Sequence, residues 1–444
     1  MTAAEKKSHP EASRILLGLL VGAVLGVSLN LLFAPAAGEE PSAGYRATLW
    51  VADYVANPIG QVFLRLLFMV VVPLVFCSIF TGVANLGSLE RLGKIGIQTL
   101  VWFVLTTALA TVLGLALVNV AKPGAHMDRQ VAETIRTEFR GAALEKMEQA
   151  QQGTGFSIAT FVNIIPRNVL RAAADERETL GVIFFALMFG IAATQLAGER
   201  MRTLLNVIES VYDLCVTVLG FAMKLAPFGV AGLIFGVTAK LGFSVLTALI
   251  YFVGVALTGL VIHQFVVLGL TGWLLVGILP QDFFSRIRTL MITAFSTSSS
   301  NATLPTTIRT TIDEFGVPPE LAGFVLPLGA TMNMNGTALF EGVAVLFLAQ
   351  VAGIELSLTQ QVIVVFLAVL TAIGAAGVPG GSLPLLAVVL AQVGVPPDML
   401  GLILGVDRLI DMSRTVPNVT SDVLCAVYLA KKSGVPIKGL PSSA

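Results

Sequence analysis

The sequence predicts an all-α polytopic membrane protein with eight transmembrane helices and two re-entrant helical hairpins. Of its 444 residues, 55% are hydrophobic and only 12% are charged, about half the charged fraction of a soluble domain. The apolar residues occur in long runs, and several runs match the roughly 20 residues that cross a bilayer as a helix. The formal net charge is zero, which gives no indication of a nucleic-acid partner.

Six apolar runs account for residues 15–276. The first run, 15–33, follows a basic tail at 1–14, and its 19 residues exceed the usual apolar core of about 7–15 residues in a signal peptide. We therefore expect a first membrane helix with a cytoplasmic N-terminus. The other five spans are expected at about 60–84, 95–121, 180–197, 205–238 and 243–276.

Polar segments between the runs set the expected topology. Arg91 follows the second span and Arg200 follows the fourth, which places both ends in the cytoplasm. Residues 122–178 carry eight basic and eight acidic residues and are expected to form an external loop. The tail at 431–444 begins with two lysines, so we expect it in the cytoplasm, consistent with eight spans.

Isolated polar residues within the spans are interpreted as structural. Glu209, Asp213 and Lys224 in the fifth span are expected at helix–helix or interfacial positions. Three histidines are too scattered along the sequence to indicate a metal cluster. The cysteines have no metal or redox spacing and are interpreted as packing residues: Cys77, Cys215 and Cys425. We therefore expect no bound cofactor.

Two short apolar arms around a small polar tip define the first hairpin. The arm at 282–295 has about 14 residues and reaches roughly 21 Å as a helix, less than the ~30 Å of a hydrocarbon core. Its tip is expected at 296–305. The same plan recurs at 360–393, with a tip at 374–382. Irregular backbone at such depth must be buried in protein or line a cavity.

Each hairpin is followed by a helix with polar residues at mid-membrane depth. The span at 321–352 is interrupted at 331–337 by two asparagines and a glycine, which indicates a broken helix. Each buried charge at mid-bilayer costs about 2.5–3.5 kcal/mol, so the polar face of the span at 400–430 is expected to line a solute site. Six residues share that face: Asp407, Asp411, Arg414, Thr415, Asn418 and Asp422.

Hairpin plus polar helix thus occurs twice within residues 281–430. Arg286 and Arg288 place the base of the first hairpin in the cytoplasm, whereas Glu355 and Asp398 flank the second on the outside. Two units of opposite orientation whose tips meet at the membrane midplane are typical of inverted-repeat transporters.

Four motifs in order resemble the glutamate transporter family, the dicarboxylate/amino acid:cation symporters. They are Ser299-Ser300 with Thr303-Leu304-Pro305, Asn333-Met334-Asn335-Gly336-Thr337, Gly377-Val378-Pro379-Gly380, and Asp411-Met412-Ser413-Arg414-Thr415 with Asn418 and Asp422. The similarity extends over essentially the whole chain. It implies an elevator-type homotrimer in a bacterial inner membrane. Residues 15–276 would be mainly scaffold, with spans 3 and 6 partly in the transport core, and residues 281–430 would move as that core.

The resemblance also implies a bacterial-type symporter of glutamate and aspartate, coupled to Na⁺, H⁺ or both, and no enzymatic activity. Asp411 would bind the ammonium group of the substrate, and Arg414 would bind its side-chain carboxylate through two parallel hydrogen bonds. Short helices with inward-pointing N-termini favour an anion, so the hairpin tips would bind the α-carboxylate. The remaining substrate contacts would be Ser299, Ser300, Thr337, Val378, Gly380, Thr415 and Asn418.

Cation sites are implied in the same way. One sodium site would consist of Asp422, Asn418, Asn333 and the carbonyl group of Gly329. A second would involve two further residues, Thr331 and Met334. Four acidic residues against Arg414 leave about three uncompensated negative charges, so an anionic substrate requires cations or protons to bind with it. The acidic residues are Asp407, Asp411, Asp422 and Glu341.

The chain departs from the family pattern at several positions. Asn335 stands where sodium-coupled members carry aspartate, and Phe103 where they carry tyrosine. Both changes remove oxygen or charge from one proposed sodium site. The additional arginine that members carry beside the substrate is absent, since Ser298 and Met412 occupy its usual places. The second hairpin has alanine at two positions that often carry a hydroxyl group, Ala372 and Ala375.

Glu341 is the expected proton carrier. It follows Thr337 by four positions, so it lies on the same helix face among apolar neighbours. Burial and nearby aspartates both favour the protonated acid. Proton-coupled members carry glutamate here, whereas purely sodium-driven ones often carry glutamine. The alternative interpretation is a glutamate held in a structural hydrogen bond.

Other functions fit less well. An intramembrane serine hydrolase would need a base beside residues 296–300, and the sequence supplies neither a nearby histidine nor a Gly-x-Ser-x-Gly turn. Paired gates around an amino-acid-shaped site disfavour a channel. Among carriers, a C4-dicarboxylate lacks the ammonium group that Asp411 would bind. A neutral amino acid lacks the carboxylate that Arg414 would bind.

Overall fold

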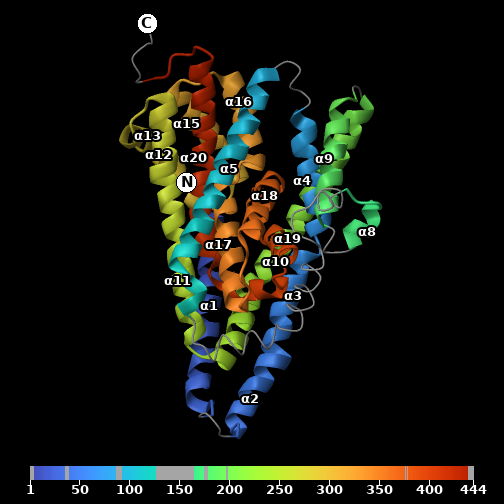
Figure 1. The fold of residues 1–444 in the computed structure, drawn as a ribbon, viewed down its shortest axis with the longest axis vertical. Helices are drawn as coiled ribbons and strands as arrows, with labels where there is room; N and C mark the ends of the chain where they lie inside the picture. The colour runs from blue at the N-terminus through green and yellow to red at the C-terminus, as the bar shows by residue number, and fades with distance from the viewer. Residues whose placement is uncertain are drawn as a thin grey trace.

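The computed structural model describes residues 5–35, 40–86, 93–126, 165–174, 179–196, 199–375, 377 and 379–438. Over these residues the fold is all-helical, and most helices run along the long axis of the molecule (Figure 1). Of the expected external loop at 122–178, the described part holds only two short helices, η3 (Pro123–His126) and α8 (Val169–Ala174). The rest of that loop lies outside the described residues.

The chain is a multi-pass membrane protein by the length and composition of its helices. Five described segments are long and apolar enough to cross a membrane: 43–81, 95–125, 201–240, 246–276 and 319–352. Shorter apolar helices cover Leu17–Phe33, Gly181–Thr194, Leu358–Ile373 and Leu383–Gln392. The expected total of eight spans stays a prediction.

The longest described helix, α10 (Glu199–Leu241), packs lengthwise against α1 (Glu5–Phe33). Small residues spaced four apart allow helix backbones to approach closely, and α1 has glycine at 18, 22 and 26. A Cβ atom at Gly22 would lie 2.4 Å from the carbonyl oxygen of Ala231, and one at Gly18 2.2 Å from that of Pro227. The two helices therefore form a tightly packed pair.

Helical structure in the second span begins near residue 43, before the apolar run that was expected from residue 60. Helical structure runs through α2 (Ala43–Val51), η1 (Ala52–Ala56), α3 (Asn57–Phe68) and α4 (Val71–Leu86). The charged residues Arg46 and Asp53 interrupt the apolar run and gave the early part the pattern of a loop. Asp53 instead pairs with Lys240 of α10, at 2.8 Å, so its charge is neutralised beside that helix.

The remaining spans before the hairpins lie close to their expected places. They are α5 (Gly93–Ala121), α9 (Thr179–Thr194) and a sixth span made of α11 (Ser244–Val261), η5 (Ile262–Val267), α12 (Leu268–Thr271) and η6 (Gly272–Val276). The elements η5 and η6 are single π-helical turns. Such turns often occur near functional sites.

The first hairpin consists of α13 (Pro280–Arg286), α14 (Arg288–Thr297) and α15 (Ser300–Phe315). Its tip is much shorter than the expected 296–305, because only Ser298 and Ser299 interrupt the helices. Ser298 adopts a left-handed conformation with φ of 51°. The Ser299 hydroxyl accepts a hydrogen bond from the backbone N–H of Ala302 at 3.1 Å, which caps α15. The polar residues up to Pro305 therefore belong to the helix.

The seventh span is broken as expected, into α16 (Pro319–Met332) and α17 (Asn335–Ala352). Its most apolar stretch is 94% buried in the protein, compared with 39–53% for the other four long segments. The span therefore lies inside the molecule, and Figure 1 shows α17 at its centre.

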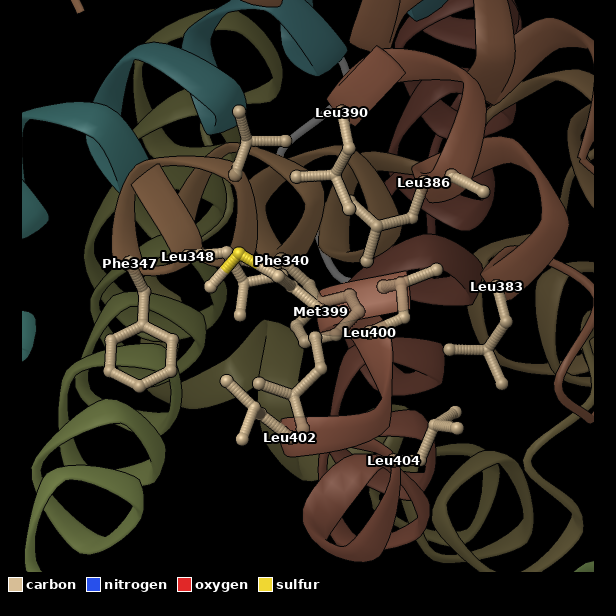
Figure 2. Packing of buried hydrophobic residues seen from close by; sticks show 14 of the residues in the cluster. Phe340, Phe347, Leu348, Leu383, Leu386, Leu390, Met399, Leu400, Leu402 and Leu404 are labelled. Carbon is tan, nitrogen blue, oxygen red and sulfur yellow. The ribbon is translucent and has the colours of Figure 1, made fainter. Parts of the chain in front are cut away.

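The second hairpin has the expected arm, tip and arm: α18 (Leu358–Gly374), a tip whose described residues 375, 377 and 379–382 are not helical, and α19 (Leu383–Gln392). After η7 (Pro397–Leu402), α20 (Leu404–Lys432) runs to the C-terminal tail. Figure 2 shows how Phe340 and Phe347 of α17 pack with residues from α19, η7 and α20. This apolar cluster fixes the last three elements around the broken helix.

Candidate functional site

The two hairpin tips, the break in the seventh span and the middle of α20 meet at one small cavity. Its volume is about 20 Å³, close to the space that a single water molecule requires. Its walls therefore converge closely. They consist of Ser298, Ser300, Met334, Thr337, Ala375, Gly377, Ser382, Asp411, Arg414, Thr415 and Asn418.

Asp411 lies at the centre of the charged groups. One carboxylate oxygen accepts hydrogen bonds from Nε and Nη2 of Arg414, at 3.1 and 2.6 Å. The other accepts from the backbone N–H of Gly380 at 3.2 Å and from Arg408 at 3.4 Å. Arg414 also lies 3.6 Å from Asp407 and stacks over the ring of Phe340. The expected substrate partners Asp411 and Arg414 thus bind each other.

Arg408 was missed by the sequence reasoning. It is 4% exposed, and it lies three residues before Asp411, a spacing at which side chains on a helix meet. That spacing was the signal that could have identified it. Counting Arg408 with Arg414 against Asp407, Asp411, Asp422 and Glu341 leaves two uncompensated negative charges. The expected value of about three is therefore wrong by one.

Asn418 connects α20 to the break in the seventh span. Its side-chain oxygen accepts a hydrogen bond from the backbone N–H of Gly336 at 2.8 Å, and its amide nitrogen lies 3.4 Å from the hydroxyl of Thr337. A Cβ atom at Gly336 would lie 2.2 Å from the carbonyl oxygen of Arg414, so only glycine permits this approach. The start of α17 is thereby held against the polar face of α20.

The tips of the two hairpins bind each other directly. The backbone N–H of Asn301 donates to the carbonyl oxygen of Gly377 at 3.2 Å, and the Ser299 hydroxyl donates to the same oxygen. Gly380 has a φ of 73°, and a Cβ atom there would lie 3.0 Å from the sulfur of Met223 in α10. The remaining expected tip residue, Val378, lies outside the described residues.

Three of the four residues expected to bind one sodium ion come together at the start of the break, whereas the fourth, Asn418, bonds to Gly336 at the start of α17. Nδ2 of Asn333 donates to Asp422 at 2.7 Å, and Gly329 approaches that carboxylate so closely that a Cβ atom would lie 2.3 Å from it. The side-chain oxygen of Asn333 is buried and has no hydrogen-bond partner among the described residues. A carboxylate and an unpartnered amide oxygen are ligands that suit a hard cation such as Na⁺.

The other residues expected near sodium are differently placed. The hydroxyl of Thr331 bonds to its own helix, at 3.0 Å from the carbonyl oxygen of Leu328. Met334 lies 3.3 Å through its sulfur from the amide nitrogen of Asn418. Phe103 and Asn335 are buried. Both amide atoms of Asn335 lack a partner among the described residues.

Glu341 is fully buried and close to the charged cluster. One carboxylate oxygen accepts a hydrogen bond from Thr371 of α18 at 2.7 Å. The other oxygen has no hydrogen-bond partner among the described residues. Arg414 acts on Glu341 electrostatically. Thr371 is the second residue that the sequence reasoning missed, because no spacing rule relates it to α17.

Comparison of this sequence with known proteins identifies its family. Residues 12–432 match the family model of the sodium:dicarboxylate symporter family. The chain is 33% identical over 428 residues to the proton/sodium-glutamate symport protein of Bacillus subtilis, covering 96% of this chain and 93% of that one. It is 33% identical over 389 residues to the proton/glutamate-aspartate symporter of Escherichia coli, with 86% of each chain covered. The C4-dicarboxylate transport protein of Laribacter hongkongensis is 33% identical over 384 residues, which cover 84% of this chain and 83% of that one. A cavity between two hairpin tips and a polar membrane helix thus occurs in a chain that belongs to the sodium:dicarboxylate symporter family, whose members are transporters and not enzymes.

Proposed function

We propose that this transporter takes up an acidic amino acid, glutamate or aspartate, together with cations. The observation that carries the proposal is the pair Asp411 and Arg414 beside both hairpin tips. A carboxylate suits the ammonium group of an amino acid, and a guanidinium suits its side-chain carboxylate. The names of the relatives from B. subtilis and E. coli include glutamate, which supports this choice.

Binding requires Arg414 to change partners. The cavity of about 20 Å³ is too small for an amino acid, so side chains or the second hairpin tip must move first. Arg414 then releases Asp411 and binds the substrate carboxylate. The ammonium group takes the released position on Asp411. Each buried charge keeps a partner through this exchange, which avoids the 3–5 kcal/mol or so that an unpaired buried charge costs.

Charge neutrality couples uptake to cations. The buried site carries two uncompensated negative charges, and an acidic amino acid brings a net charge of about −1 at neutral pH. Burial of this charge requires cations or protons to accompany the substrate. Asp422, Asn333 and the carbonyl group of Gly329 would hold a sodium ion as cargo, and Glu341 would carry a proton.

An elevator movement fits the packing. The α1–α10 pair would be part of a fixed scaffold, because its glycine contacts leave no space for sliding. The hairpins with the seventh and eighth spans, residues 281–430, would move against it. Met223 of α10 contacts Gly380 of the second hairpin, so the moving and fixed parts would meet there. Within this scheme the two hairpins are re-entrant inverted repeats, and the second hairpin tip is the outer gate.

A homotrimer is supported by a polar face on the outside of α10. Six residues of this helix share one face and are exposed, although the helix is long and apolar enough to span a membrane. Polar groups at lipid-facing positions are costly, whereas a helix–helix interface can satisfy them. We infer that this polar face of α10 contacts other copies of the chain. Its members are Asn206, Ser210, Asp213, Thr217, Gly220 and Lys224.

We place the protein in a bacterial inner membrane with both termini in the cytoplasm. Lys431 and Lys432 are exposed at the end of α20, where the positive-inside rule favours the cytoplasmic side. Relatives from B. subtilis and E. coli support a bacterial setting.

The proposal is tested by uptake into proteoliposomes with imposed sodium or proton gradients. Labelled glutamate or aspartate should accumulate against its gradient and saturate, as a carrier requires and a channel does not. Arg414→Ala should abolish this accumulation, because the substrate carboxylate loses a buried partner worth about 3–5 kcal/mol. The control is Arg309→Ala, since Arg309 is exposed on α15. Equal accumulation by the Arg414 variant would exclude the proposed substrate class.

One observation favours a second candidate substrate, a C4-dicarboxylate. Arg408 adds a second buried guanidinium on Asp411, and two guanidinium groups can serve two carboxylates without an ammonium group. Competition distinguishes the candidates. Succinate in excess should leave labelled glutamate uptake unchanged if the amino acid is the substrate, and should suppress it if dicarboxylates bind the same site.

A further inference from the structure

The contact between Glu341 and Thr371 joins the broken seventh span to the second hairpin. Both side chains have no exposed surface. Thr371 lies three residues before the end of α18, the arm that leads into the hairpin tip. The hydroxyl oxygen is 2.7 Å from one Glu341 oxygen, 2.9 Å from the carbonyl oxygen of Leu367 and 3.1 Å from that of Ala368.

A threonine hydroxyl has one proton, so it can donate to only one of these oxygens at a time. When Glu341 is ionised, it can only accept, and the hydroxyl must donate to it. When Glu341 is protonated, the acid donates to the hydroxyl oxygen, and the hydroxyl proton turns to the carbonyl oxygen of Leu367. Proton uptake therefore reverses the direction of one hydrogen bond while the link between α17 and α18 is kept.

Few other groups act on this carboxylate. Besides η3, which carries His126 and packs through Gly124 against Phe347 and Gln350, the helices packed against α17 are mainly α5, α11, α18, α19 and α20. Of these, α11, α18 and α19 have no Asp, Glu, Lys, Arg or His, and α5 has only Lys94 near its first turn. On α20, Arg414 acts on Glu341 electrostatically, and that guanidinium is already paired with Asp411 and Asp407. The Thr371 hydroxyl is thus the only uncharged donor that the described residues supply to Glu341.

We propose that Thr371 is a positioning residue for proton coupling, which sets the pH at which Glu341 takes up its proton and transmits that event to the second hairpin. The inference rests on the proposed role of Glu341 as proton carrier. Loss of the Thr371 hydroxyl removes a hydrogen-bond donor to Glu341. This loss destabilises the ionised carboxylate more than the neutral acid, so Glu341 should hold its proton to a higher pH. A hydrogen bond to a charged group contributes enough to move a titration by about one pH unit or more.

The test compares the pH dependence of labelled substrate uptake in proteoliposomes. Thr371→Val should raise the pH of half-maximal uptake by about one unit, whereas Thr371→Ser, which keeps the hydroxyl, should restore the wild-type profile. Thr371→Ala repeats the measurement if the valine variant does not fold. Thr311→Val is the matched control, because Thr311 is a buried threonine whose hydroxyl bonds only within α15, at 2.7 Å from the carbonyl oxygen of Thr307.

A second readout is independent of transport. The infrared band of the protonated carboxyl group, assigned by its loss in Glu341→Gln, should titrate at a higher pH in Thr371→Val than in wild type. If Glu341→Gln keeps both the band and the pH dependence of uptake, the proton role of Glu341 is wrong. If Glu341→Gln removes them but the Thr371 variants titrate like wild type, only the inference about Thr371 is overturned.

Discussion

At the residue scale, Asp411 shows how one carboxylate can serve several parts of the molecule. It binds two arginines of its own helix and the backbone of the second hairpin tip. Arg414 faces the cavity. Arg408 lies one turn beyond Gly405, which packs against α1 and α10. Two guanidinium groups therefore compensate part of the negative charge of the site, Arg414 beside the cavity and Arg408 one turn from the contact with α1 and α10.

Arg408→Gln should change the affinities for substrate and cation in opposite directions. One positive charge at roughly 10 Å and an effective dielectric constant near 20 contributes about 1.7 kcal/mol, or more than tenfold in an equilibrium constant. The glutamate concentration for half-maximal uptake should rise by about that factor. The concentration of the coupled cation that gives half-maximal uptake should fall. Arg408→Lys should retain wild-type values. Weakening of both affinities would show instead that Arg408 only supports the local structure.

Sequence spacing predicted the polar face of α20 but not all of its partners. Asp411, Arg414 and Asn418 follow from helix periodicity, and all three line the cavity. Arg408 falls off that face, but the length of an arginine side chain lets it reach Asp411. Thr371 comes from another helix, and only tertiary packing brings it to Glu341.

At the element scale, the second hairpin tip has few side chains to hold it. Residues 375–382 are mostly small, and the described contacts with the rest of the site are backbone bonds through Gly377 and Gly380. Such a segment has little side-chain packing to lose when it opens, which favours a mobile gate. The first hairpin differs, because Ser299 caps α15 and leaves a tip of two residues.

A cysteine at Ser382 should report this opening. The Ser382 side chain is 5% exposed and its hydroxyl has no hydrogen-bond partner among the described residues, so the substitution removes no described bond. Modification by a membrane-impermeant thiol reagent should be fast without substrate and at least tenfold slower with saturating substrate. The three native cysteines are buried. Labelling that does not respond to substrate would argue against the tip as a gate.

Element boundaries were predicted less well than element types, for physical reasons. The break at residues 333 and 334 was visible because asparagine and glycine interrupt an apolar helix. The early part of the second span was not, because Asp53 resembles a loop residue until Lys240, 187 positions later, is seen to pair with it. The length of the first hairpin tip was overestimated because its serine and threonine residues can also begin a helix.

At the scale of the whole molecule, we propose that copies of the chain assemble through the polar face of α10. Exposed Asp213, Thr217 and Lys224 give one side of a membrane helix the character of an interface. The moving residues 281–430 would then work against a scaffold fixed by its neighbours. This division predicts that contacts between copies involve α10 and not the hairpins.

Cysteine crosslinking tests the assembly. Thr217→Cys treated with a three-armed maleimide reagent, which can join three thiols, should form crosslinked species up to trimers in native membranes, because the polar face of α10 would lie near other copies. Ile250→Cys is the control, since Ile250 is 66% exposed on α11 and apolar, as a lipid-facing residue should be. Crosslinking only to dimers, or equally at both positions, would contradict the trimer.

The α1–α10 pair also has a consequence for biosynthesis. Gly18 meets Pro227, and 227 − 18 is 209 residues of intervening synthesis. At about 5–20 residues per second, a ribosome needs roughly 10–40 s to make that length. For this time the glycine-lined side of α1 has no α10 to cover it in the bilayer. We therefore expect the N-terminal helix to be inserted first but to reach its final place only after the fifth span has left the ribosome.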